Sequence, residues 1–307
     1  MLLPLFKALA DNTRLRLIAI LDRGEFTVQE LVGILQMGQS RISRHLKILT
    51  EAGVISVKRE GTWAYYRLDP QNSYFRSQLP ELRDMFYEIE DAERDSAYVN
   101  EILAQRSDRS QKFFQQHAHE WDRLARELLP TPDYFPQLYE SLPSGELLIE
   151  IGVGTGSMLR DLSCITRSVI GVDHSPAMLQ AAGERVASDG LGNIDLRLGE
   201  MEHLPVENNV ADVVLLHMVL HHAASPEAVI AEVQRVLRAS GRVFIVDLLR
   251  HRHEWVRERL ADQWLGFECS ELEQWCRTCG LNDIRYQVTE GTSGQSSVVQ
   301  LEAVKTG

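Results

Sequence analysis

Three alternate glycines placed directly after an apolar segment constrain the fold of this chain more than any other feature of its sequence. In the run "LLIEIGVGTGSML", Glu150 precedes Gly152, Gly154 and Gly156. Glycines at the end of a strand permit backbone conformations that a side chain would forbid, and they let a ligand approach the main chain. The amides of a following helix N-terminus favour an anionic group. The run therefore predicts a strand, loop and helix that bind a small molecule.

Apolar segments with strand character alternate with amphipathic helices along the second half of the chain. The predicted strands lie near 147–151, 168–172, 194–198, 211–216 and 242–249. This alternation is typical of a parallel, doubly wound sheet. Two later apolar runs, 283–289 and 298–304, can close that sheet as a hairpin. We therefore expect an α/β domain with a Rossmann-like, seven-stranded mixed sheet.

The spacing of the glycines argues against a dinucleotide. A G-x-G-x-x-G fingerprint that starts at Gly152 requires glycine at position 157, where this chain has Ser157. Asp173 ends the next predicted strand, and a carboxylate there can accept hydrogen bonds from both hydroxyls of a ribose. The sequence thus argues against a dinucleotide fingerprint and favours a ligand that contains a ribose.

From about residue 113 onward the chain resembles class I S-adenosylmethionine methyltransferases of the UbiE-like group. The resemblance rests on "EIGVGTG", "VIGVDHSPAML", "LGEMEHLPV" and "ADVVLLHMVLHHAASPEAVIAEVQRVLRASGRVFIVDLL", with "FFQQHAHEWDRL" as an entrance lid. It implies that the glycine loop holds the amino-acid tail of S-adenosylmethionine or S-adenosylhomocysteine. It further implies a ribose contact by Asp173, adenine contacts by Glu200 and the Met201 backbone, packing by His174 and Met178, and a position beside the methionine tail for His217.

The N-terminal segment predicts a winged helix-turn-helix. Thr27 and Glu30 have the spacing of a capping box, so a helix should begin there. A second helix is expected from about 40 to 52, with Gly53 as its stop. Its polar and cationic side suits the major groove of DNA. The expected DNA-contacting residues on and beside this helix are Gln39, Ser40, Arg41, Ser43, Arg44 and Lys47.

Two strands should follow the second helix as a wing. They are predicted over 54–59 and 62–68, with a turn at residues 60–61, and Lys58 and Arg59 precede the tip, where they can reach phosphates. "LFKALADNTRLRLIAIL", "QSRISRHLKILTEAGVI" and "VKREGTWAYYRL" resemble ArsR-family regulators. That resemblance implies a homodimer formed through helices at about 1–10 and 72–100. It also implies binding to an inverted repeat in double-stranded DNA.

Charge is consistent with this division of the chain. The whole chain has a net charge of −12, but residues 1–70 contain ten Lys or Arg and seven Asp or Glu, a net of +3. No apolar run is long enough to span a membrane, and the first residues do not form a secretory signal. We therefore expect a cytoplasmic protein with a DNA-binding domain at 1–70, a helical dimerisation and lid segment at 71–129, and a ligand-binding domain at 130–307.

The histidine and cysteine patterns favour neither a metal site nor an identifiable catalytic residue. The histidine pairs His117/His119 and His251/His253 lack further ligands at a spacing suitable for a metal. His221 and His222 could contact a methyl acceptor, or they could be helix-capping or solvated histidines. Many ArsR-family members bind metals through cysteines in the first helix of the DNA-binding motif, but residues 1–163 of this chain contain no cysteine. Cys269, Cys276 and Cys279 are typical of structural thiols, so arsenic methylation is the least favoured function.

Two main functions therefore remain open. The first is a transcriptional regulator, a repressor in our interpretation, that senses S-adenosylhomocysteine or S-adenosylmethionine. Fusions of this type resemble S-adenosylhomocysteine-responsive repressors of methionine-cycle genes. The second is an active methyltransferase with an attached DNA-binding domain. Methyl transfer from a sulfonium depends mostly on positioning, so the absence of an evident base does not decide between them.

Overall fold

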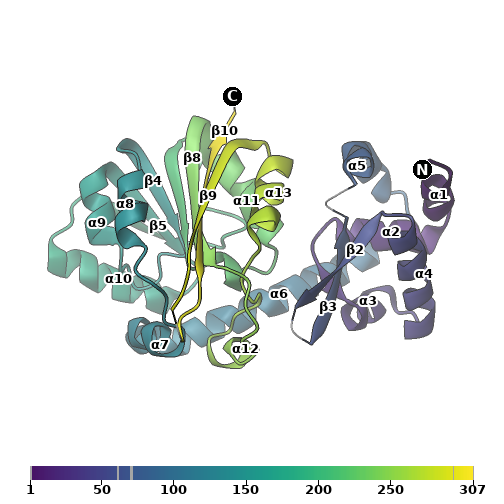
Figure 1. The fold of residues 1–307 in the computed structure, drawn as a ribbon, viewed down its shortest axis with the longest axis horizontal. Coiled ribbons are helices and arrows are strands. Elements are labelled where there is room, and N and C mark those ends of the chain that lie inside the picture. The colour runs from purple at the N-terminus through teal and green to yellow at the C-terminus, as the bar shows by residue number, and fades with distance from the viewer. Residues whose placement is uncertain (1, 61, 70–71, 293, 307) are drawn as a thin grey trace. The chain divides into compact units, whose positions relative to one another are not determined.

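A computed structural model describes residues 2–60, 62–69, 72–292 and 294–306. The chain forms two compact units, residues 1–106 and 107–307 (Figure 1). Among the described residues, no helix has the length and apolar character needed to cross a bilayer.

The first unit is a helix-turn-helix with a small antiparallel sheet. Its helices are α1 (Leu2–Leu9), α2 (Asn12–Leu21), α3 (Val28–Leu35), α4 (Gln39–Glu51) and α5 (Ser73–Phe86), and its strands are β1 (Phe26–Thr27), β2 (Ile55–Glu60) and β3 (Trp63–Leu68). The strand order is β1-β3-β2. The expected turn of the wing includes Gly61, which lies outside the described residues. The predicted winged helix-turn-helix is confirmed.

Local sequence determines where the two central helices of this unit begin and end. Thr27 forms the predicted capping box, because the Glu30 amide donates to Thr27 Oγ1 and the Thr27 amide donates to Glu30 Oε2, at 3.3 and 2.7 Å. Helix α4 ends at Ala52 as its C-cap, and Gly53 adopts a φ of +67°, a left-handed conformation that glycine accepts readily. The apolar side of α4, with Ile42, is buried in the core.

The second unit is a three-layer α/β domain. Its strands are β4 (Gly145–Ile151), β5 (Thr166–Asp173), β6 (Ile194–Leu198), β7 (Ala211–His217), β8 (Leu237–Leu248), β9 (Leu281–Thr289) and β10 (Val298–Lys305). The order is β6-β5-β4-β7-β8-β10-β9, and β10 runs antiparallel to both of its neighbours. All seven predicted strands are present, and the mixed sheet is confirmed.

Helices cover both faces of this sheet. Figure 1 shows α8 (Phe135–Ser141), α9 (Leu159–Ile165) and α10 (Pro176–Asp189) on one side, with α11 (Pro226–Val236) and α13 (Cys269–Thr278) on the other. The shorter elements are η1 (Ala118–Glu120), α7 (Trp121–Leu128), η2 (Leu220–His222) and α12 (Val256–Arg259). The connection between α7 and β4 includes helix α8, and Pro136 is tolerated in its first turn because a missing amide hydrogen costs nothing there.

Helix α6 (Ala92–His117) belongs to both units, since the boundary at residues 106–107 falls within it. Val99 packs in the core of the first unit. Phe114 packs with Met178 in a small cluster of the second unit. One continuous helix therefore carries contacts to both predicted functional regions.

Candidate functional site

The glycine loop between β4 and α9 has the backbone that its sequence predicts. Gly152, Gly154 and Gly156 have φ values of +70°, +53° and +76°. A Cβ on Gly152 would lie 2.1 Å from Val219 Cγ2, whereas a Cβ on Gly154 would meet no atom closer than 4.0 Å. Gly152 is thus required for packing, and the main chain at Gly154 borders open space that a ligand can approach.

Asp173, at the end of β5, is tied to this loop. Its Oδ2 accepts a hydrogen bond from the Gly154 amide at 2.9 Å, and its Oδ1 accepts one from the Ser175 amide at 2.8 Å. The side chain is buried, and this burial raises the pKa of Asp173. The carboxylate therefore lies at the loop, where the sequence placed it, and its ribose contact remains a prediction.

Glu150, the penultimate residue of β4 before the loop, has a carboxyl group without a charged partner. It is 2% exposed, and its Oε2 is buried without a hydrogen-bond partner. Burial, with a smaller contribution from the charge of Asp173, raises the pKa of Glu150 to about 8. Such a group favours a cationic partner, and the ammonium of an amino-acid tail has the required charge.

The residues expected around the adenine lie near helix α6. Ser107 Oγ donates to Glu200 Oε2 at 3.0 Å, and Gln111 Nε2 donates to the carbonyl oxygen of His174 at 2.8 Å. Met178 and Met201 are buried. His174 Nε2 is also buried and lacks a hydrogen-bond partner. The α6 contacts were missed by the sequence analysis, because helical periodicity alone does not identify which sheet loop a helix covers.

His217, at the end of β7, contacts a residue that the sequence did not single out. Tyr134 Oη lies 2.8 Å from His217 Nε2. Burial lowers the pKa of His217 to about 4, so its ring is neutral near pH 7. The expected neighbour of the methionine tail is therefore uncharged.

A polar cluster lies beyond the ends of β7 and β8. His221 and His222 in η2, Asp247 in β8 and Asp262 after α12 are all buried. Burial disfavours the charged ring of His221, but the carboxylates of Asp247 and Asp262 outweigh it and raise the pKa of His221 to about 9. A solvated or capping pair was one expectation for His221 and His222, and their burial argues against solvation. Asp262 was missed, because no motif marks the irregular segment that contains it.

The predicted DNA-contacting face of α4 is exposed as a group. Its exposed residues are Gln39, Ser40, Arg41, Ser43, Arg44 and Lys47. The opposite face, with Leu46 and Leu49, is at most 1% exposed. The helix therefore has the two-sided character that binding in a major groove requires.

The two wing cations differ in their surroundings. Arg59 is exposed, but Lys58 is only 5% exposed, and its Nζ lies 3.6 Å from Glu25 Oε2 and 3.4 Å from Glu60 Oε1. The expectation that Lys58 reaches phosphates is wrong in this structure, because its side chain points inward to two carboxylates. Successive side chains of a strand point to opposite faces, and this alternation places Lys58 on the buried face of β2. Its position next to the wing tip in the sequence does not reveal this.

The cysteines differ in their surroundings: Cys276 is buried, Cys269 and Cys279 are half-buried, and Cys164 is exposed. Cys276 is fully buried in α13, and burial raises the pKa of its thiol to about 12. Metals and arsenite bind the thiolate form. The structure therefore does not favour Cys276 as a ligand of arsenic.

Comparisons with known proteins agree with this geometry. Residues 11–57 match the model for bacterial regulatory proteins of the arsR family, and residues 149–245 match a methyltransferase domain model. The chain is 49% identical to the arsenic resistance transcriptional regulator ArsR1 of Pseudomonas putida over 67 residues, 22% of this chain and 52% of that protein. It is 33% identical to the arsenite methyltransferase of Halobacterium salinarum over 123 residues, 38% of this chain and 30% of that protein. The chain thus spans about half or less of the length of these relatives.

A solved structure supports the fold of the second unit. The S-adenosylmethionine-dependent methyltransferase of Aquifex aeolicus superimposes with a TM-score of 0.50 at 19% identity, covering 62% of this chain and 97% of that one. The helix-turn-helix, the order of the seven strands and the two family matches lead to one identification: the chain carries an N-terminal DNA-binding domain of the ArsR family fused to a class I S-adenosylmethionine methyltransferase domain.

Proposed function

We propose that this chain is a transcriptional repressor whose DNA affinity is controlled by S-adenosylhomocysteine bound to its methyltransferase domain. The observation that carries this proposal is helix α6, which contacts the expected adenine-binding residues in one unit and the helix-turn-helix in the other. A ligand changes an equilibrium only through differential interaction with two states. A shared helix supplies a physical element that both sites can bias.

On the DNA-binding side, α6 is held by charged contacts as well as by its core residues. Asp95 forms a bidentate pair with Arg16 of α2, at 2.5 and 2.7 Å. Arg106 donates to Glu30 Oε1 at 2.7 Å, and Glu30 closes the capping box at the start of α3. A change in α6 would therefore act on the helices that present α4.

On the ligand side, the next residues of the same helix contact the expected adenine region. Ser107 bonds Glu200, Gln111 bonds the His174 backbone, and Phe114 packs on Met178. An adenine ring bound beside Glu200 would compete with or reinforce these contacts. We infer that ligand binding alters α6 through them.

The residues present fit an adenosyl amino acid. The loop at Gly154 offers open backbone, Asp173 lies beside it, and the unpartnered Glu150 carboxyl suits the ligand's ammonium. S-adenosylmethionine, when bound, supplies a methyl group on a sulfonium. In this proposal the neutral His217 and Tyr134 border the sulfur, an environment that penalises the sulfonium cation and favours S-adenosylhomocysteine.

We also propose that the repressor is a homodimer that binds an inverted repeat. Large apolar side chains are exposed on two helices of the first unit: Leu3 and Phe6 on α1, and Tyr74 and Met85 on α5. These are the helices through which the family resemblance implies dimerisation. A two-fold dimer presents two α4 helices to successive major grooves about one helical turn apart.

We expect Arg44→Ala in the full chain to weaken binding to a selected inverted-repeat duplex by about 1–3 kcal/mol, the scale of one base-edge contact. Arg59→Ala should weaken binding to all sequences alike and reduce the salt slope by about one. Anisotropy titrations at several salt concentrations, using a duplex selected from a random library, measure both. Arg160→Ala, which removes an exposed cation of α9, serves as the control. Equal affinity of the Arg44→Ala variant and the parent would contradict the assignment of α4 to the groove.

S-adenosylhomocysteine should release the full chain from this duplex at a concentration at least about tenfold lower than S-adenosylmethionine does, a coupling difference within the usual 1–3 kcal/mol. Titration of the DNA complex with each compound measures release, and calorimetry on the free protein measures binding. Asp173→Ala should bind DNA normally and lose the response. Release by S-adenosylmethionine alone, or an unchanged response in Asp173→Ala, would refute the sensing proposal.

The alternative is an enzyme, favoured by the 33% identity to an arsenite methyltransferase. A product assay with S-adenosylmethionine and arsenite plus thiol, or with a panel of other acceptors, tests it. The burial of Cys276 argues against this thiol as an arsenite ligand, whereas Cys269 and Cys279 are half-buried. Turnover on any acceptor would favour the enzyme over the sensor.

A further inference from the structure

We propose that His221, His222 and Asp262 form a binding site for one divalent cation of the zinc class. The site lies in the second unit, beyond the ends of β7 and β8, and the proposal does not depend on the sensing function. It assigns a role to three buried residues that the adenosyl site does not use.

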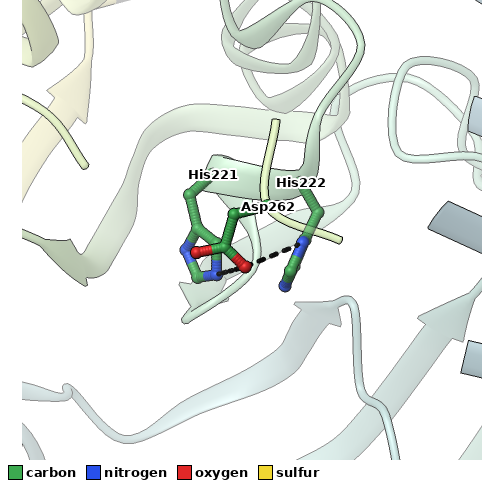
Figure 2. Close-up of side chains that lie close together, drawn as sticks. All are labelled: His221, His222 and Asp262. Carbon is green, nitrogen blue, oxygen red and sulfur yellow. Dashed lines mark ion pairs between the residues drawn. The ribbon is translucent and has the colours of Figure 1, made fainter. Parts of the chain in front are cut away.

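The three donors are close enough to share an ion. His221 Nε2 lies 4.0 Å from Asp262 Oδ1, and His222 Nδ1 lies 3.8 Å from the same oxygen. One ligand atom from each residue lies within 4.8 Å of the other two. Figure 2 shows the Asp262 carboxylate between the two imidazole rings. Metal–ligand distances of about 2.0–2.2 Å would require only a small contraction of this group.

Within the described part of the chain, the Asp262 carboxylate has no hydrogen-bond partner, and its partners are the two imidazoles that lie at ion-pair distance. Both carboxylate oxygens of Asp262 are buried without a hydrogen bond, and Asp262 is 3% exposed. His222 Nδ1, the nitrogen that faces Asp262, forms a long 3.4 Å hydrogen bond with the Ala261 carbonyl oxygen, which it would give up on binding an ion, and His222 Nε2 is buried without a partner. A buried carboxylate without hydrogen bonds is costly, and a bound cation would remove that cost.

Asp247 orients one of the imidazoles for this role. Its Oδ1 lies 2.7 Å from His221 Nδ1, and the pair is completely buried. A ring whose Nδ1–H donates to a carboxylate presents Nε2 as a ligand atom, which is the usual arrangement around protein-bound zinc. His221 Nε2 is the atom that faces Asp262, and it would release its proton to solvent when the ion binds. The geometry therefore contains both the ligands and the group that fixes one of them.

Two imidazoles and one carboxylate favour a borderline divalent ion over magnesium or calcium, which prefer oxygen ligands. Three protein donors leave one position of a tetrahedral set for water or an oxygen donor. Phe114 and Trp121 pack edge-on near His222, with ring centroids 4.9 and 6.3 Å away. The ion would thus be held beneath aromatic side chains of the lid segment.

The test begins with the full chain stripped by a chelator and then titrated with zinc chloride or cobalt chloride. We expect one equivalent of metal per chain by elemental analysis after gel filtration, and a visible cobalt spectrum typical of nitrogen and oxygen ligands. Asp262→Asn, which is nearly isosteric, and His222→Gln should lower affinity at least tenfold. Asp247→Asn should lower it about 10–100-fold while the site is retained.

Two controls separate this site from other metal binding. His253→Gln removes an exposed histidine and should leave affinity unchanged, and Cys279→Ser tests the nearby thiols. Circular dichroism establishes that each variant is folded. Equal metal binding by Asp262→Asn and the parent, no binding by the parent, or a thiolate-to-cobalt charge-transfer band lost in Cys279→Ser would each overturn the proposal.

Discussion

Gly152→Ala should lower the free energy of unfolding of the second unit by about 3–5 kcal/mol and reduce affinity for S-adenosylhomocysteine at least tenfold. The added methyl would lie 2.1 Å from Val219 Cγ2 and 2.8 Å from Val219 Cβ, in a backbone conformation that an L-residue adopts only with strain. Either β4 or the segment around Val219 must move, and the loop amide that donates to Asp173 moves with it. Denaturant unfolding followed by tryptophan fluorescence, with calorimetric titration, measures both effects.

Gly190→Ala is the matched control for this prediction. Gly190 has nearly the same φ, +66°, but a Cβ there would meet nothing within 4 Å. Gly190→Ala should therefore lower the free energy of unfolding through backbone strain alone, by about 1–2 kcal/mol, and it should leave ligand affinity unchanged. Adding Val219→Ala to Gly152→Ala should restore part of the stability, because Cγ2 is removed. If both glycine variants lost equal stability, the close approach to Val219 would not be the cause.

The fold could be predicted from sequence because its signals are local and repeated. The capping box at Thr27, the stop at Gly53 and the alternation of strands with helices each depend on a few neighbouring residues. The position of β10 between β8 and β9 is a pairing between distant strands. The sequence predicted a hairpin of β9 and β10, but it did not predict which of the two strands pairs with β8. The apolar pattern of a strand does not specify the strand with which it pairs.

The site was predicted only where residues follow strand ends. Asp173 could be placed because the carboxyl ends of parallel strands meet at one edge of the sheet. The same rule applied to β8 would have found Asp247. Asp262 could not be found in this way, because tertiary folding brings an irregular segment against η2. Lys58 shows the opposite error, in which a charged residue near a predicted wing tip is turned inward by strand alternation.

Arg16→Met should lower the free energy of unfolding of the first unit by about 3–5 kcal/mol. Arg16 joins α2 to α6 through a buried bidentate pair with Asp95, and its Nη1 lies 3.2 Å from Asp91 Oδ2. Removing the cation leaves the Asp95 carboxylate, 5% exposed, without its principal counter-charge, and breaking a buried pair in this way costs about that much. Hydrogen exchange of the α2 and α4 amides, which accelerates about tenfold per 1.4 kcal/mol, reports on this unit alone.

A second arginine–aspartate pair in the same unit provides the comparison that decides whether burial is the cause. Arg83 of α5 makes a bidentate pair with Asp22, at 2.7 and 2.8 Å; the Asp22 side chain is 10% exposed, but the arginine that covers it is 55% exposed, so water can replace it. Arg83→Met should therefore cost no more than about 1 kcal/mol. Replacing both members of the buried pair, Arg16→Met with Asp95→Leu, should recover much of the loss, because no unpaired charge remains. Similar losses of unfolding free energy for Arg16→Met and Arg83→Met would contradict this explanation. They would mean that the number of hydrogen bonds lost, and not an unpaired buried carboxylate, determines how stably α6 packs against the DNA-binding helices.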